Sequence, residues 1–214
     1  MNAKTSAALI VVSALISSDH SSHAAQILMS APFNGHTYHM VGGSGAAGTG
    51  INYTDASAYA TQLGGFLVTV NDAAENLFLY DTFANAQLAG FQPVDGLYLG
   101  FNDVAVEGTF VWDSGSTSLY TNWAAGEPNN THGREDWASM VGKRAAGASN
   151  YGLSTWNDIP NIASTGEVGA NPSAPFYGIV EIVPEPASIT LVVCSALILL
   201  TQRTVRLNSY VKTY

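Results

Sequence analysis

Two helical segments followed by a series of short strands are the feature that most constrains the fold of this chain. Apolar residues recur at helical spacing over Tyr53–Leu63 and Asp72–Leu88, and strand candidates lie close by at His36–Val41 and Phe66–Val70. Every later periodic segment is short and rich in β-branched and aromatic residues: Leu97–Phe101, Thr109–Trp112, Trp137–Val141, Tyr151–Trp156 and Phe176–Ile182. This order predicts an α+β fold in which two helices pack on a small antiparallel sheet.

The boundaries of the helices can also be predicted. A glycine-rich loop at 42–50 precedes the first helix, which has Thr54 or Asp55 near its cap position and ends before Gly64-Gly65. The second helix carries apolar residues on one side, which we expect to face the core: Leu77, Tyr80, Phe83 and Ala84.

Both ends of the chain indicate targeting segments. Residues 1–25 carry a positive charge near their start at Lys4, continue with the apolar run Ala7–Ile16 and end in small residues. This pattern is typical of a secretory signal peptide. An ordinary amino-terminal helix is the alternative. At the other end, the apolar run Ile189–Leu200 is shorter than the ~20 residues of a comfortable membrane span. It could serve as a transient anchor, with the basic residues after it in the cytoplasm.

The remaining segment, 26–183, is long enough to form one domain with a buried core. Only Asp19 and Glu185 of the 16 acidic residues lie outside it, so 14 carboxylates face three cations, a net charge of −11. Such a charge argues against nucleic acid as a partner and favours cations or neutral polar ligands. The only cysteine is Cys194, outside the domain, so the domain has no disulfide.

The long polar segment Asp113–Glu135 has no clear period, and such a loop in a compact domain is usually functional. Within it, GEPNNTHGREDW gathers the oxygen-bearing side chains Glu127, Asn129 and Glu135. Calcium takes 6–8 oxygen ligands, and Asn157 and Asp158, after a predicted strand, could complete its shell. A cis bond before Pro128 would turn the flanking carbonyls to one point, and we predict that isomer.

Each of these signals also has a simpler interpretation. Glu-Pro-Asn alone is usually just a turn, and Asn157-Asp158 could equally lie in a turn before Pro160. His132 is expected to be an exposed loop residue and not a ligand. The tryptophans are expected in the core more than at a ligand: Trp112, Trp123, Trp137 and Trp156.

Taken together, these residues resemble the C-type lectin-like domain over Gly35–Ile182. The matching segments stand in the order and spacing of the family: the first helix and its strand at 53–70, the second helix at 72–79, Leu97–Asp103 in place of the family's Trp-Ile-Gly-Leu strand, Glu107–Trp112, the approach to the tripeptide at 120–130, and Trp156-Asn157-Asp158. The resemblance implies the C-type lectin-like fold, α+β, with a long calcium-binding loop.

The resemblance also implies a set of ligands. Carried over by position, the principal Ca²⁺ site and the carbohydrate site share five residues: Glu127, Asn129, Glu135, Asn157 and Asp158. The Glu-Pro-Asn order is associated with mannose, glucose, fucose or N-acetylglucosamine, whose adjacent hydroxyls pair with acids and amides. A possible second metal site would involve Asp103, Glu107, Asn130 and Asp136 together with Glu135. There Asn130 stands in place of a usual aspartate.

The chain departs from the family in its cysteines. The four usual cysteines would fall near Ala60, Trp137, Asn161 and Val180, where none is present. Each such bridge typically contributes 2–4 kcal/mol, so packing and bound calcium must substitute for the two bridges.

The carboxyl-terminal segment, 184–214, resembles a second known element. Val183-Pro184-Glu185-Pro186, the apolar run and the arginines are similar to the PEP-CTERM sorting signal of Gram-negative bacteria. That resemblance implies processing by an exosortase and display at the cell surface or in the extracellular matrix. A plain membrane anchor is the alternative.

These observations favour a calcium-dependent protein that binds glycans or extracellular polysaccharide. The alternative is a structural or protein-binding member of the same fold in which calcium only stabilises the loop. An enzyme is not expected, because no Ser–His–Asp order or zinc-type spacing is present, and the metal would occupy the carboxylates.

Overall fold

The computed structural model describes residues 25–44, 49–85, 94–142, 151–162 and 175–184. The predicted signal peptide, the predicted sorting signal and Cys194 therefore lie almost wholly outside the described residues. Within the described ranges, no helix is both long enough and apolar enough to cross a bilayer.

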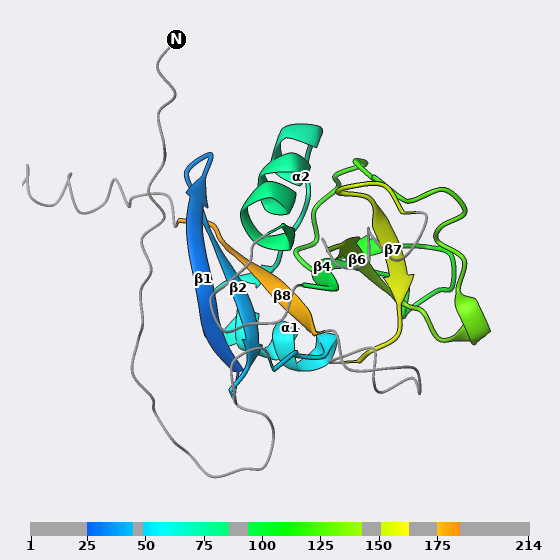
Figure 1. Ribbon diagram of the computed structural model, residues 1–214, viewed down its shortest axis with the longest axis horizontal. Helices are drawn as coiled ribbons and strands as arrows, with labels where there is room; N and C mark the ends of the chain where they lie inside the picture. Colours follow the sequence, from blue (N-terminus) through cyan, green and yellow to red (C-terminus); the bar gives the residue numbers. More distant parts are fainter. Residues whose placement is uncertain (1–24, 45–48, 86–93, 143–150, 163–174, 185–214) are drawn as a thin grey trace, which may run out of the picture. The chain divides into compact units, whose positions relative to one another are not determined.

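One sheet of eight strands organises the domain (Figure 1). Its main path runs β1-β2-β8-β4-β6-β7, with β3 paired to β8 and β5 paired to β4. The strands are β1 Ala25–Phe33, β2 His36–Gly43, β3 Phe66–Leu67, β4 Gly96–Asn102, β5 Val111–Trp112, β6 Trp137–Val141, β7 Trp156–Ile159 and β8 Phe176–Ile182. This confirms the α+β class and most of the predicted strands.

The sheet is mixed, and the prediction of a purely antiparallel sheet was wrong in this respect. β8 pairs in parallel with β4, through Gly96 opposite Phe176 and Tyr98 opposite Gly178, and antiparallel with β2. A parallel neighbour needs a long connection, and β8 follows β4 only after β5, the long loop, β6 and β7. The last strand is thereby inserted at the centre of the sheet.

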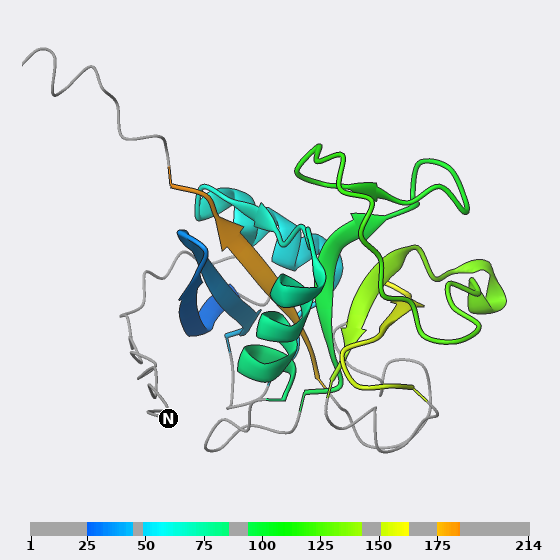
Figure 2. The same ribbon diagram turned by 90° about the horizontal axis from the view of Figure 1, so that it is seen from above.

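The two helices lie on either side of β8 (Figures 1 and 2). Alternate residues of a strand point to opposite faces, and in β8 they enter two separate cores. Tyr177 and Ile179 join the larger core with the segment after α2, whereas Phe176 and Val180 join the smaller core with α1. The sheet is therefore covered on both faces at its centre.

α1, Tyr53–Gln62, begins directly after the residue whose side chain caps it. The N-cap is Asn52, whose Oδ1 accepts from the amide of Asp55 at 2.8 Å. The predicted cap position, Thr54 or Asp55, therefore lies two or three residues beyond the true N-cap. Gly64 adopts φ +79°, which glycine tolerates without cost, so the helix ends where the sequence indicated.

α2, Ala73–Leu79, continues into a wider π-turn, η1, at Tyr80–Ala84. The amide of Asn85 donates to the carbonyl of Tyr80 at 2.8 Å, five residues back. Tyr80, Phe83 and Ala84 are buried as predicted, but Leu77 is 54 % exposed and Leu79 takes its place. The predicted end at Leu88 lies outside the described residues.

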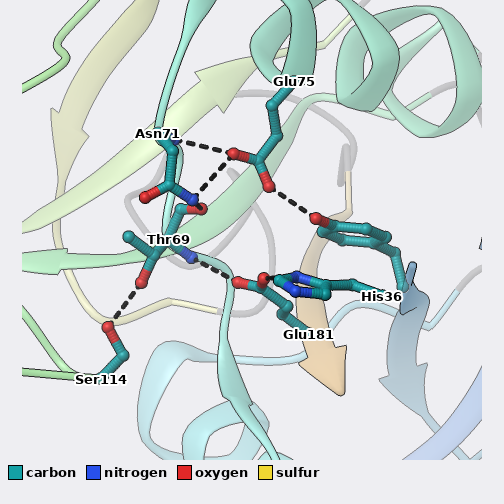
Figure 3. A network of polar contacts seen from close by, with 7 residues as sticks. His36, Thr69, Asn71, Glu75, Ser114 and Glu181 are labelled. Atoms are coloured by element: carbon teal, nitrogen blue, oxygen red, sulfur yellow. Dashed lines mark hydrogen bonds and ion pairs between the residues drawn. The ribbon is translucent and has the colours of Figure 1, made fainter. Parts of the chain in front are cut away.

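Two buried carboxylates tie α2 to the sheet (Figure 3). Glu75 accepts from the amide and side chain of Asn71 and from the hydroxyl of Tyr38, at 2.6 Å in the last case. Glu181 on β8 accepts from the amide of Thr69 and lies 2.5 Å from Nδ1 of His36. These bonds satisfy charges that are costly to bury without partners.

β7 begins at Trp156, which corrects the prediction of a strand over Tyr151–Trp156. Ser154 adopts φ +61°, and the amide of Thr155 bonds to the carbonyl of Gly152, so the preceding residues form a turn. The predicted strand was placed too early because of the apolar residues in this segment. As a result, Asn157 and Asp158 lie within β7 and not after a strand.

Candidate functional site

The long segment between β5 and β6 is anchored at its middle to β7. The amide of Trp156 donates to the carbonyl of Asn122, and the amide of Ala124 donates to the carbonyl of Trp156, each at 2.8 Å. Trp123 and Trp156 form an isolated parallel bridge there. Apart from the short turn η2 at Thr131–Gly133, most of the loop has irregular backbone, as the sequence indicated.

Asp158 joins the loop to the strand and is only 1 % exposed. Its carboxylate accepts from the backbone amide of Asn129 at 3.1 Å and from that of Asn130 at 2.7 Å. A buried carboxylate is stabilised by such donors, and the donors fix the loop backbone in return. The two distant pieces of chain that the sequence predicted to converge therefore do meet.

Tyr151 connects two further residues of the predicted set. Its hydroxyl donates to Oε1 of Glu127 at 3.1 Å and lies 3.5 Å from Oδ1 of Asn157. Burial and the nearby Glu127 raise the pKa of Tyr151 to about 12, so the phenol stays protonated and donates at neutral pH. The Glu127–Pro128 peptide bond is cis, as predicted.

The remaining predicted ligands are held within the loop itself. Oε2 of Glu135 accepts from the amide of Thr131 at 2.8 Å, and the hydroxyl of Thr131 donates to Oδ1 of Asn129. Oδ1 of Asn130 accepts from the amide of Glu135 at 3.2 Å. His132 is exposed with φ +60°, consistent with a loop residue outside the site.

The carboxylates of this region raise one another's pKa. Burial is the largest cause for Glu127 and Glu135, and the charge of Asp158 adds to it in both. Among the described residues, no Lys or Arg forms an ion pair with these acids. The site is therefore a region of concentrated negative potential in which, over the described ranges, no Lys or Arg is paired with these acids.

The residues of the possible second metal site lie beside the first set. Asp103 is buried, and its Oδ2 accepts from the amide of Gly108 at 2.8 Å. Burial raises the pKa of Asp103, and the charges of Glu107 and Asp158 raise it further. The pKa of Asp136 is raised by burial and by the charges of Asp103 and Asp158. The charge of Asp158 thus raises the pKa of acids in both predicted sets.

Two oxygens in this region show that the residues fit a cation. Oε2 of Glu127 and Oδ1 of Asp103 are buried carboxylate oxygens without a hydrogen-bond partner among the described residues. Each predicted set contains one of these oxygens, and a hard cation bound in each set would give that oxygen a partner. No three Asp, Glu, His or Cys side chains in the described ranges are arranged around one point. The three acids of the predicted principal set, Glu127, Glu135 and Asp158, are therefore not gathered around one point in this structure.

Comparison with known proteins identifies the family. The family model of the lectin C-type domain matches residues 49–164, more than half of the chain, including all the predicted ligands. The chain therefore belongs to the C-type lectin domain family. An alpha-N-acetylgalactosamine-specific lectin of Patiria pectinifera is 32% identical over 131 residues, which cover 59% of this chain and 68% of that lectin. A perlucin-like protein of Mytilus galloprovincialis is 31% identical over 121 residues, covering 56% and 68%.

Solved structures show the same fold. The C-type carbohydrate-recognition domain of cow CD23 aligns with a TM-score of 0.52 at 20% identity, covering 73% of this chain and 94% of that domain. The C-type lectin CEL-I from Cucumaria echinata aligns with a TM-score of 0.52 at 20% identity, covering 72% and 96%. The predicted C-type lectin-like fold is thereby confirmed.

Two features of the site were not predicted from the sequence. Tyr151 carries no motif, because a lone tyrosine in an apolar stretch is normally assigned to a strand. The role of Asp158 as an acceptor for loop amides also has no sequence signature, since it depends on a loop folded back from residues far away. Of the four tryptophans, Trp112 and Trp156 are buried, and Trp123 and Trp137 are half-buried.

Proposed function

We propose that this chain binds carbohydrate through calcium held by Glu127, Asn129, Glu135, Asn157 and Asp158. The observation that carries the proposal is the unpartnered Oε2 of Glu127, buried among acids that form no ion pair with a Lys or Arg of the described residues. Membership of a lectin family supports a binding role and not a catalytic one.

The chemistry of the donor set suits a ligand with two neighbouring hydroxyls. Calcium bound there would supply a positive charge able to accept sugar oxygens as ligands. The carboxylates of Glu127 and Glu135 accept hydrogen bonds from hydroxyls, and the amide groups of Asn129 and Asn157 donate them. Tyr151 and Asp158 keep the loop and strand halves of this set together.

The order of acid and amide favours mannose, glucose, fucose or N-acetylglucosamine as the preferred sugar. This inference rests on the Glu-Pro-Asn order at 127–129, since exchanging acid and amide would reverse donor and acceptor. The relative from Patiria pectinifera is named for N-acetylgalactosamine, a sugar of the other hydroxyl arrangement. A screen must therefore include both classes of sugar.

The test is a glycan-binding screen of the full chain with calcium and with a chelator. We expect binding only with calcium, and the double variant Glu127→Gln plus Asn129→Asp should shift the preference toward galactose-type sugars. Asp81→Asn, which neutralises an exposed acid outside the site, is the matched control and should bind as the native chain does.

Three results would reject the proposal. Sugar binding that persists in chelator at the same affinity would show that the glycan does not bind through the metal. Sugar binding that does not weaken as acid protonates the carboxylates would do the same. Calcium binding without any sugar signal would favour the alternative, a structural or protein-binding domain in which calcium only stabilises the loop.

We also propose that Asp103, Glu107, Asn130, Glu135 and Asp136 hold a second calcium ion. The unpartnered Oδ1 of Asp103 supports it. Glu107→Gln should lower the number of bound calcium ions from two to one per chain, measured by calorimetry, while sugar binding is retained.

Export and surface display complete the proposal. A signal peptide at 1–25 and an exosortase signal at 184–214 would place the domain at a bacterial cell surface or in a polysaccharide matrix, after transient anchoring in the inner membrane. Mass spectrometry of the mature protein in its native host would test this, because intact ends would contradict processing.

A further inference from the structure

A cleft of 620 Å³ lies between α1 and the hairpin of β4 and β5. Its size is in the range of small-molecule sites, which are about 300–1,000 Å³. One wall is the exposed face of α1, the other comes from the hairpin, and aromatic rings lie between them. None of the residues predicted to bind calcium lines it.

The α1 wall presents hydroxyl groups in a row. Thr54, Ser57 and Thr61 are three and four residues apart, so they share one face of the helix. The hydroxyl of Thr61 donates to the carbonyl of Ser57 at 3.1 Å, and that of Thr54 donates to Asn52 at 3.0 Å. Their oxygens keep acceptor capacity toward the cleft.

The opposite wall presents a carboxylate whose orientation is fixed. Asp113 accepts from the hydroxyl of Tyr53 at 2.5 Å and from the side-chain amide of Asn102 at 2.8 Å. Its own backbone amide donates to the carbonyl of Gly100 at 2.7 Å. Because hydrogen bonds already fix both carboxylate oxygens and the backbone of Asp113, binding a ligand there costs little further conformational entropy.

Aromatic rings supply the apolar part of the cleft. The rings of Tyr53 and Trp137 lie with centroids 5.7 Å apart, and Phe66 also lines the cleft. Trp137 and Phe66 are only half-buried, so part of each ring is open. Such surfaces pack well against the C–H groups of a ring ligand whose edges are polar.

The charges of the lining select the class of ligand. Among the described residues that line the cleft, Asp113 is the only charged one, and none is a Lys, Arg or His that could hold an anion. Hydroxyl acceptors, an amide and one oriented carboxylate suit a neutral ligand rich in hydroxyl groups. Together with the aromatic rings, they match the face and edges of a pyranose sugar.

Asp158 lies on the face of the sheet opposite the cleft. Successive side chains of a strand alternate, so Trp137 and Ala138 point in opposite directions. Trp137 pairs with Ile159 and packs in the smaller core beside α1, whereas Ala138 pairs with Asp158. Asn157 pairs with Ser139 and so shares the face of Trp137, but it does not line the cleft. A ligand in the cleft would therefore contact none of the predicted calcium ligands.

We propose that this cleft is a second carbohydrate subsite, which binds one neutral pyranose unit without calcium. It goes beyond the calcium-dependent function proposed above, and either proposal can fail without the other.

The test follows the indole N–H of Trp137 and the side-chain amide of Asn102 by NMR. The ¹⁵N-labelled full chain, in excess chelator, is titrated with the methyl glycosides of glucose, mannose and galactose. We expect saturable shifts at both groups with at least one glycoside. Asp113→Asn should weaken that binding about tenfold, because it removes a charged acceptor.

A matched pair of variants separates occupation of the cleft from general damage. Ser57→Met fills the cleft from α1 and should abolish the shifts, whereas Gln62→Met, exposed on the same helix and outside the cleft lining, should leave them unchanged. Glu127→Gln, which removes a predicted calcium ligand, should also leave them unchanged.

Three outcomes would overturn the proposal. The first is the absence of saturable shifts with all three glycosides in chelator. The second is equal affinity in Ser57→Met and Gln62→Met. The third is a response to tetramethylammonium but to no glycoside, which would make the cleft a cation site built on Asp113 and the aromatic rings.

Discussion

At the scale of single residues, Tyr151 shows how one hydroxyl can order a set of oxygens. It reaches Glu127 on the loop and Asn157 on β7, which belong to distant parts of the chain. Its bond to Oε1 of Glu127 leaves the other oxygen, Oε2, without a partner. Tyr151 is therefore a positioning residue for the predicted metal site and not a ligand.

Replacing Tyr151 by Phe should weaken calcium binding about tenfold, because a hydrogen bond to a charged acceptor is lost. Isothermal titration calorimetry measures the affinity. Tyr177→Phe is the matched control, since the hydroxyl of Tyr177 is buried without a partner among the described residues. That control should bind calcium normally and gain about 1 kcal/mol of stability. Equal calcium affinity in the two variants would contradict the role of Tyr151.

The buried Glu181 should make stability depend on pH. Burial raises its pKa above the ordinary 4.5, the bond from His36 lowers it in part, and the charge of Glu75 raises it. The folded state therefore binds the proton more tightly than the unfolded chain. The stability due to Glu181 is full below pH 4.5 and is lost as the pH rises through its folded pKa.

Glu181→Gln removes this titration and keeps an acceptor for the amide of Thr69. In chelator, its free energy of unfolding should fall less than that of the native chain between pH 4.5 and about pH 7. Urea unfolding at several pH values gives the comparison. Asp81→Asn, at an exposed position, should follow the native curve, and a Gln variant that also follows it would refute the assignment.

At the scale of elements, the loop 113–136 depends on acids that a cation would bind. The amides of Asn129 and Asn130 donate to Asp158, and that of Thr131 donates to Glu135. Without a cation, the mutual repulsion of these carboxylates opposes the same arrangement. The loop and the metal should therefore stabilise each other.

Removal of calcium should speed hydrogen exchange in 113–135 and leave β8 protected. The two conditions are compared by mass spectrometry of peptides from the same sample. Peptides from Phe176–Ile182 serve as the internal reference, because that strand lies between two others at the centre of the sheet. Unchanged protection of the loop in chelator would show that calcium does not order it.

The sequence predicted elements with a clear period and missed those without one. β4, β6 and β8 were predicted almost to the residue, because each is a short apolar run rich in β-branched and aromatic residues that is buried on both faces of the sheet. β1 was missed because it contains Pro32 and has no regular alternation, which an edge strand tolerates. Leu77 was assigned to the wrong side of α2, because Asn76, Leu79 and Phe83, three and four residues apart, define the buried face.

At the scale of the whole molecule, packing replaces the family's two missing bridges. Ala60 on α1 and Val180 on β8, where one bridge is expected, are both fully buried in the smaller core. Near the other, Trp137 pairs with Ile159, and Asn161 accepts from the amide of Thr54 at 3.2 Å. The first contact joins β6 to β7, and the second ties α1 to the residues after β7, both without sulfur.

Restoring the first bridge should stabilise the domain. The double variant Ala60→Cys plus Val180→Cys, once oxidised, should raise the free energy of unfolding by about 2–4 kcal/mol. Denaturant titration with and without a reducing agent measures the gain. Each single variant controls for the loss of core volume, and a pair that stays reduced under oxidising conditions would show that the two positions do not approach as inferred.

The position of the cleft away from the predicted calcium ligands has a consequence for a solution of long polymers. Sugar bound at both of the proposed sites would make a single copy bivalent, so that it needs no dimerisation to join two polymers. A small amount of such a protein would then turn a polysaccharide suspension into a gel, and a chelator would release the sugar from only one of the two proposed sites.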